Sequence, residues 1–144
     1  MKAITLIFLT IFLGKSCSNE AQNDMASASL EYVATTRGFY QKIVIANQKA
    51  FITNDRNGKE APKEVAISDK DWKELVGYFE KINLEEIPNL KDPTQKRFYD
   101  GAAIANLEVT YQGKKYKTTE FDHEFPPAAI EKLVNKIVSI GKQE

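Results

Sequence analysis

The residue types best suited to chemistry gather in one short segment, Phe121-Asp122-His123-Glu124-Phe125. His123 is the only histidine in the chain, and an imidazole between two carboxylates could act as a general acid or base. Asp122 and Glu124, together with Asp100 or Glu120, could also offer oxygen ligands to calcium. The same acids are typical of a polar turn before a helix, because the helix dipole favours negative charge at its N-terminus. We therefore expect a solvated corner here, with a catalytic or metal site as the alternative.

Motifs for metals, cofactors and nucleophiles are missing from the sequence. A zinc site draws on several histidine or cysteine ligands, whereas the chain holds one of each, His123 and Cys17. The segment 55–60 resembles a calcium loop only superficially, because Lys59 stands where a third acid or amide is needed. The glycines do not cluster into a phosphate-binding loop, and no Gly-x-Ser-x-Gly elbow occurs. The sequence thus predicts no catalytic residue, no metal and no cofactor.

The N-terminus carries the clearest information on location. Lys2 precedes an uncharged, mostly apolar run over residues 3–13, and Cys17 follows Gly14-Lys15-Ser16. The run is shorter than the roughly 20 residues that a membrane-spanning helix needs, and this layout is typical of an export signal. The segment resembles the signal of bacterial lipoproteins of the Bacteroidota type, which is cut just before a lipid-modified cysteine, although Lys15 departs from the small residues usual there. An ordinary secretory signal with an incidental cysteine is the alternative.

The resemblance implies that Cys17 is the lipidation site and that its acyl chains hold the protein to a bacterial membrane. It implies export and an anchor in the outer membrane, on the periplasmic or the surface face. Residues 1–16 are then the signal peptide, the polar residues 17–29 a flexible tether, and residues 30–144 a single domain. Removing the two lysines of the signal from the 20 basic residues leaves 18, against 20 acidic residues. This balance gives no basic field for nucleic acid.

Two kinds of periodicity predict the elements of the domain. Alternating apolar residues predict strands, and apolar residues at helical spacing predict helices. Ser68 can cap the first helix, Gly141 can end the second, and Gln112-Gly113 can form a hairpin turn. The predicted fold is α+β: an antiparallel β-sheet of about five strands in the order βββα-ββα, with two amphipathic helices packed on one face. The expected strands are 30–35, 39–46, 50–53, 103–111 and 114–121, and the expected helices are 68–82 and 126–140.

Aromatic and arginine side chains suggest one interaction surface. Arg37 and Tyr40 stand at the start of the expected strand 39–46, and Arg97, Phe98 and Tyr99 stand before the second hairpin. Tyrosine and arginine are enriched at interface hot spots. If they share the outer face of the sheet, Arg37, Tyr40, Arg97 and Tyr99 form a binding patch. Ordinary sheet packing with scattered exposed rings is the alternative.

These observations favour a lipid-anchored cell-envelope protein that acts as a non-enzymatic binding or interaction module. Its partner would be an envelope protein, a peptide or a glycan, recognised on the open face of the sheet. The alternative function is a small envelope hydrolase or metal-dependent enzyme that uses the Asp122-His123-Glu124 corner.

Overall fold

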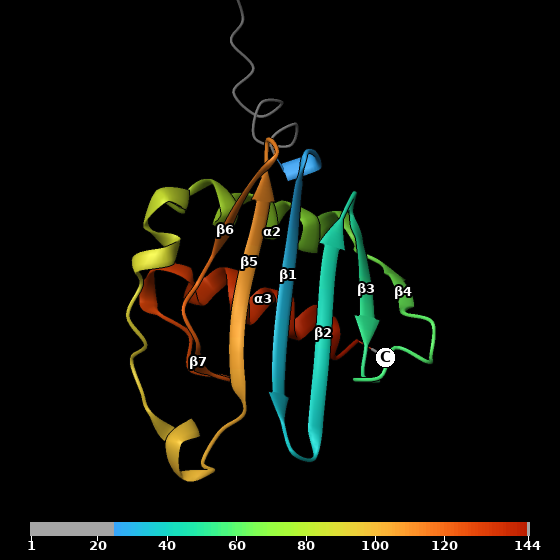
Figure 1. Ribbon diagram of the computed structural model, residues 1–144. Helices are drawn as coiled ribbons and strands as arrows, with labels where there is room; N and C mark the ends of the chain where they lie inside the picture. The colour runs from blue at the N-terminus through green and yellow to red at the C-terminus, as the bar shows by residue number, and fades with distance from the viewer. Residues whose placement is uncertain (1–24, 144) are drawn as a thin grey trace, which may run out of the picture.

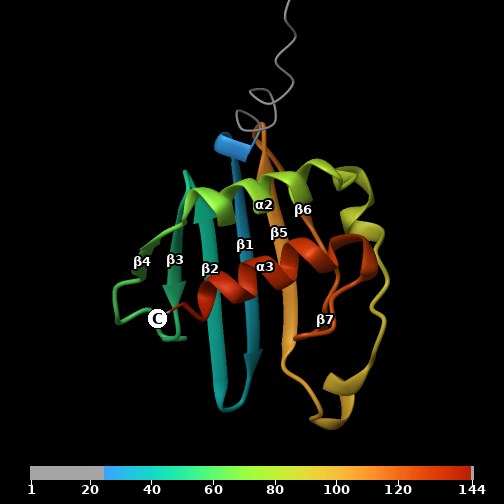
Figure 2. The same cartoon turned by 180° about the vertical axis from the view of Figure 1, so that it is seen from behind.

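The computed structural model describes residues 25–143 as one antiparallel sheet with the long helices on a single face (Figures 1 and 2). The strand order is β4-β3-β2-β1-β5-β6, and β7 pairs with β5. The predicted α+β fold is confirmed. In chain order the elements are β1 (Ala28–Thr36), β2 (Phe39–Ala46), β3 (Lys49–Thr53), β4 (Lys63–Ala66), α2 (Asp69–Glu80), the 3₁₀ helices η1 (Leu84–Asn89) and η2 (Lys96–Tyr99), β5 (Ile104–Tyr111), β6 (Lys114–Lys117), β7 (Phe121–Asp122), η3 (Ala128–Ile130) and α3 (Glu131–Gly141).

The sheet has seven strands, two more than the sequence predicts. One of them, β4, pairs with β3 at the edge of the sheet, with Val65 opposite Ala50. Val65 is the one residue of β4 that is partly buried, and the other three are exposed. A strand of four residues with a single buried side chain shows no alternation, so its sequence does not predict a strand.

The other additional strand arises because the predicted strand 114–121 is interrupted. After β6 the chain meets β5 through a side chain: the N–H of Leu107 donates to the Thr118 hydroxyl at 3.0 Å. The Thr118 N–H donates in turn to the carbonyl of Leu107 at 2.9 Å. The hydroxyl takes the place of a backbone acceptor, which ends the regular ladder, and Phe121 then begins β7 against β5.

The core lies between the sheet and the two long helices. The inward residues of β1, Leu30, Tyr32 and Ala34, are fully buried, as their alternation predicts. The helices contribute the apolar stripes expected from helical spacing. The buried members are Trp72, Leu75, Val76 and Phe79 of α2, and Leu133, Val134, Ile137, Val138 and Ile140 of α3.

The folded part begins earlier than Leu30, so the predicted tether of residues 17–29 is too long. Met25 is fully buried in the core, and Ala28 and Ser29 already pair with Tyr111 and Thr110 of β5. The burial of Met25 cannot be predicted from the sequence, because a single apolar residue among polar and small ones gives no periodicity. The signal peptide, Cys17 and the tether up to residue 24 lie outside the described residues.

The Ser68 cap and the hairpin turn read from the sequence are confirmed, whereas the second helix begins at Glu131 and not at 126, and Gly141 lies inside it with Lys142 as the C-cap. The Ser68 hydroxyl accepts the N–H of Asp71 at 3.1 Å and caps α2. Gln112 and Gly113 form the turn between β5 and β6, both at positive φ. The expected register holds, with Tyr111 opposite Lys114, Val109 opposite Tyr116 and Glu108 opposite Lys117.

Candidate ligand-binding groove

The side chains of the Asp122-His123-Glu124 corner point into different parts of the fold. Asp122 is fully buried, and its carboxylate points toward η2. Burial alone would raise the pKa of Asp122, but hydrogen bonds outweigh it and lower the pKa to about 2. Each carboxylate oxygen has two donors, so Asp122 acts as a clamp for η2. The four donors are the Thr94 hydroxyl (2.6 Å), the N–H groups of Lys96 (2.6 Å) and Arg97 (3.0 Å), and the Arg97 guanidinium (3.1 Å).

His123 and Glu124 point elsewhere. The Nδ1 of His123 shares a hydrogen bond of 2.7 Å with the Tyr32 hydroxyl, and its ring lies 5.4 Å from that of Phe39. Burial lowers the pKa of His123, which favours the neutral imidazole. Glu124 lies near Lys142, at 3.9 Å. Across residues 25–143, no three histidine, cysteine or acidic side chains are placed to hold a metal ion.

The predicted patch of Arg37, Tyr40, Arg97 and Tyr99 does not form. Arg97 is the residue that excludes it, because its side chain is only 9% exposed and pairs with Asp122 at 3.1 Å and with Asp92 at 2.8 Å. Tyr99 is 72% exposed but belongs to η2, off the sheet. Arg37 lies in the turn between β1 and β2, which leaves Tyr40 as the member on the open face.

Ion pairs between neighbouring strands occupy part of the outer face of the sheet, the face that carries no helix. Lysine and glutamate side chains of neighbouring strands meet across this face, and their charges are matched within the protein. Exposed pairs of this kind contribute little to stability, but they leave few unmatched groups for a partner. The pairs are Lys42 with Glu31 (3.2 Å), Lys49 with Glu64 (2.7 Å) and Lys115 with Glu108 (3.1 Å).

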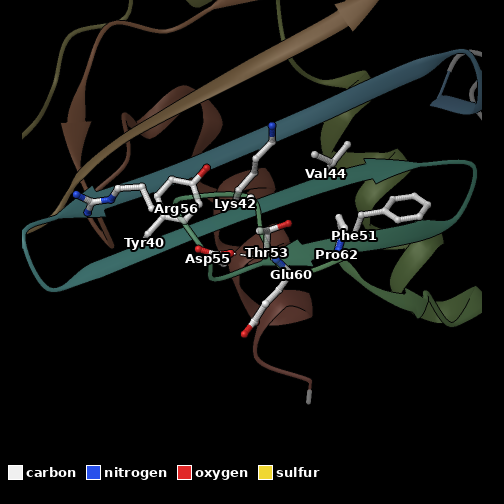
Figure 3. Close-up of a pocket in the computed structure, with 10 residues that line it drawn as sticks. Tyr40, Lys42, Val44, Phe51, Thr53, Asp55, Arg56, Glu60 and Pro62 are labelled. Atoms are coloured by element: carbon white, nitrogen blue, oxygen red, sulfur yellow. Dashed lines mark hydrogen bonds between the residues drawn. The ribbon is translucent and has the colours of Figure 1, made fainter.

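A groove of about 460 Å³ opens over β2 and β3 (Figure 3). Its floor consists of outward side chains of the two strands, and its wall is the loop 54–62 that joins β3 to β4. The volume falls within the range of roughly 300–1,000 Å³ typical of small-ligand sites. The lining residues are Tyr40, Lys42, Val44, Phe51, Thr53, Asp55, Arg56, Gly58, Glu60 and Pro62.

Aromatic rings stand at the two ends of the groove floor. Tyr40 lies at one end and Phe51 at the other, with Lys42 and Thr53 between them (Figure 3). The register fixes this spacing, because Val44 is the partner of Phe51 and lies four residues beyond Tyr40 on β2. At 3.2–3.4 Å per residue this places the two ends about 13 Å apart along the strand.

The wall of the groove is held in shape by Asp55. Its carboxylate accepts the N–H groups of Asn57 at 2.9 Å, Lys59 at 2.6 Å and Glu60 at 3.0 Å. These bonds, led by that from Asn57, lower the pKa of Asp55. Gly58 takes a positive φ of 65°, a conformation that glycine adopts without steric cost. The acid is thus engaged by its own loop.

Arg56 ties this wall to the neighbouring turn between β1 and β2, at the same end of the sheet. Its Nη2 donates to the Thr35 hydroxyl at 2.9 Å, to the carbonyl of Phe39 at 3.2 Å and to the carbonyl of Thr36. The guanidinium carbon lies 5.9 Å from the centre of the Tyr40 ring, within the range of a cation–π contact. Loop, turn and aromatic floor therefore form one connected unit.

The sequence predicts one side of this groove and misses the other. Alternation in 39–46 places Tyr40, Lys42 and Val44 on the outer face, as observed. The sequence analysis assigns neither Phe51 nor the loop 54–62 to a binding site. The short turn after Ala46 could have placed Phe51, because a tight turn there fixes the register of the two strands and sets Phe51 opposite Val44.

Comparison with protein-family models, with curated proteins and with solved structures finds no match to this chain. Among the helices within residues 25–143, none is both long enough and apolar enough to cross a membrane.

Proposed function

We propose that this chain is a lipid-anchored cell-envelope protein that binds a ligand in the groove over β2 and β3, without catalysing a reaction on it. One observation carries the proposal. On a face with three lysine–glutamate pairs, the groove contains the partly exposed rings of Tyr40 and Phe51. Concave, partly apolar surface with a few polar groups is the usual form of a ligand site.

The arrangement of titratable groups supports binding over catalysis. In the groove Asp55 is held by N–H groups of its own loop, and Lys42 pairs with Glu31. At the Asp122-His123-Glu124 corner, Asp122 bonds to Arg97 inside the protein and His123 bonds to Tyr32. A hydrolase needs its acid, base and substrate pocket to converge, and these groups diverge.

The lipid anchor in this proposal rests on the sequence of residues 1–17. Replacing Cys17 with serine should release the protein from membranes into the soluble fraction and abolish its labelling by a fatty-acid analogue. The wild-type chain expressed in the same host is the control. Continued membrane association of the Cys17→Ser variant would contradict the anchor while leaving the groove untouched.

The binding function is tested by retention of envelope components on the immobilised protein. We expect the wild type to retain at least one component that a Tyr40→Ala, Phe51→Ala double variant loses, because alanine removes both ends of the floor. Lys115→Ala is the matched control, since Lys115 is exposed on the same face but belongs to the ion-paired region. Identical retention by all three proteins would rule out the groove as the binding site.

A further inference from the structure

We propose that the groove takes a neutral oligosaccharide chain lying along β2 and β3, with one sugar ring on Tyr40 and another at Phe51. This inference rests on the proposed function, since it names the class of ligand for the same site. It follows from the charge, the length and the hydrogen-bonding groups of the groove.

The charge of the groove points to a neutral ligand. Its lining contains two cations, Lys42 and Arg56, and two anions, Asp55 and Glu60, so the formal charges cancel. Three of the four are also engaged within the protein: Lys42 by Glu31, Arg56 by the turn between β1 and β2, and Asp55 by its own loop. Of these groups, only Lys42 has an ionic partner within the described residues, because Arg56 and Asp55 are held by neutral groups. With two charges of each sign along the lining, the groove favours a ligand without net charge.

The length of the groove points to a chain of rings. Tyr40 and Phe51 mark apolar ends about 13 Å apart along the strand direction, with the polar side chains of Lys42 and Thr53 between them (Figure 3). A single sugar ring cannot cover both ends. The C–H faces of sugar rings pack on aromatic rings as other apolar surface does, so a short chain can contact Tyr40 and Phe51 at once.

The hydrogen-bonding groups distinguish a sugar from a peptide. Glu60 can only accept and Lys42 can only donate, while the Thr53 hydroxyl does both. Sugar hydroxyls donate and accept, and so they match all three. Proline-rich peptides also dock in aromatic-lined grooves, but they carry few N–H groups to offer Glu60. Extended peptides bind sheet edges through backbone bonds, and this groove lies on a face.

The inference is tested by titration calorimetry on the full chain, held in a detergent without a sugar headgroup. The probes are cellohexaose, xylohexaose and mannohexaose as neutral chains, cellobiose as a chain too short for both ends, hexagalacturonic acid as the charged analogue, and a proline-rich peptide. We expect a neutral hexasaccharide to bind at least tenfold more tightly than cellobiose and the acid. Tyr40→Ala and Phe51→Ala should each weaken that binding about tenfold, while Lys115→Ala should leave it unchanged.

The outcomes separate this inference from the proposed function. Tighter binding of the peptide or the acid, lost in the Tyr40→Ala variant, would overturn the neutral oligosaccharide and keep the groove as a binding site. Absence of binding by every neutral chain at millimolar concentration would also overturn the inference. Binding of a neutral chain that neither Tyr40→Ala nor Phe51→Ala weakens would overturn both. Thermal unfolding followed by Trp72 fluorescence verifies that each variant is folded.

Discussion

Replacing Asp122 with asparagine tests whether this carboxylate, the one that is fully buried within residues 25–143, is a structural clamp. The amide keeps the size of the side chain and one acceptor oxygen, but it removes the charge and places an NH₂ group against donors. Two of the four donors then lose their acceptor, and Arg97 keeps only Asp92 as an ionic partner, at 2.8 Å. Removing one partner of a buried ion pair costs about 3–5 kcal/mol. Since Asp92 still neutralises Arg97, we expect about 3 kcal/mol of destabilisation at pH 7.

The pH dependence of this loss follows from the pKa of Asp122. The folded protein lowers that pKa from an ordinary 3.8 to about 2, which corresponds to about 2 kcal/mol at roughly 1.4 kcal/mol per pKa unit. Because the folded pKa is the lower one, this stabilisation is complete above about pH 5 and disappears as the pH falls toward 2. At pH 3 about 1 kcal/mol of it is already lost. The asparagine variant cannot titrate here, so its stability gap to the wild type should shrink by that amount.

The assay is urea unfolding at pH 6 and pH 3, followed by the fluorescence of Trp72. Trp72 is the only tryptophan and is buried in the core, so its emission reports global unfolding. Asp92→Asn is the control: it removes the more exposed contact of Arg97 and should cost less than about 1 kcal/mol. A gap between wild type and Asp122→Asn that is the same at both pH values would refute the assignment of the lowered pKa to Asp122.

Three further predictions concern packing and capping. Gly141→Ala should destabilise the protein by about 1–2 kcal/mol, because the added methyl would overlap the side chain of buried Ile43. Gly77→Ala is its counterpart inside α2, where nothing lies within 4 Å of the new methyl, and it should stabilise by about 0.5–1 kcal/mol. Ser68→Ala should cost about 1 kcal/mol through loss of the cap on Asp71. Unfolding curves of the three variants check these values, and a stabilising Gly141→Ala or a neutral Ser68→Ala would contradict the geometry.

Local patterns in the sequence were enough to predict what local physics decides. Ser68 precedes a helical stripe, and Gln112-Gly113 joins two alternating runs, so the cap and the hairpin register were predictable. The burial of Arg97 and its pairing with Asp122 were not predictable. Its partner Asp122 lies 25 residues away, and no periodicity links an arginine in an irregular segment to an acid in a two-residue strand.

The groove escaped prediction for a related reason. Tyr40 could be placed on the outer face by alternation, but what makes it part of a site is the loop 54–62. That loop takes its shape from Asp55 and reaches the sheet through Arg56, whose acceptors lie 17–21 residues earlier. Asn57-Gly58 is typical of a turn, and the structure has a turn there. Only the folded chain shows that this turn forms one wall of a groove.

The burial of Met25 also bears on how the groove would be presented. If Cys17 carries the anchor, the eight residues 17–24 separate the membrane from the fold and span at most about 28 Å, less than a tether to residue 29 would. The chain enters β1 beside Tyr111, whereas Tyr40 pairs with Thr35 near the other end of β1. Seven strand residues separate those two ends, or about 24 Å. The Tyr40 end of the groove would therefore point away from the anchored end of the domain, where a chain-like ligand has free approach.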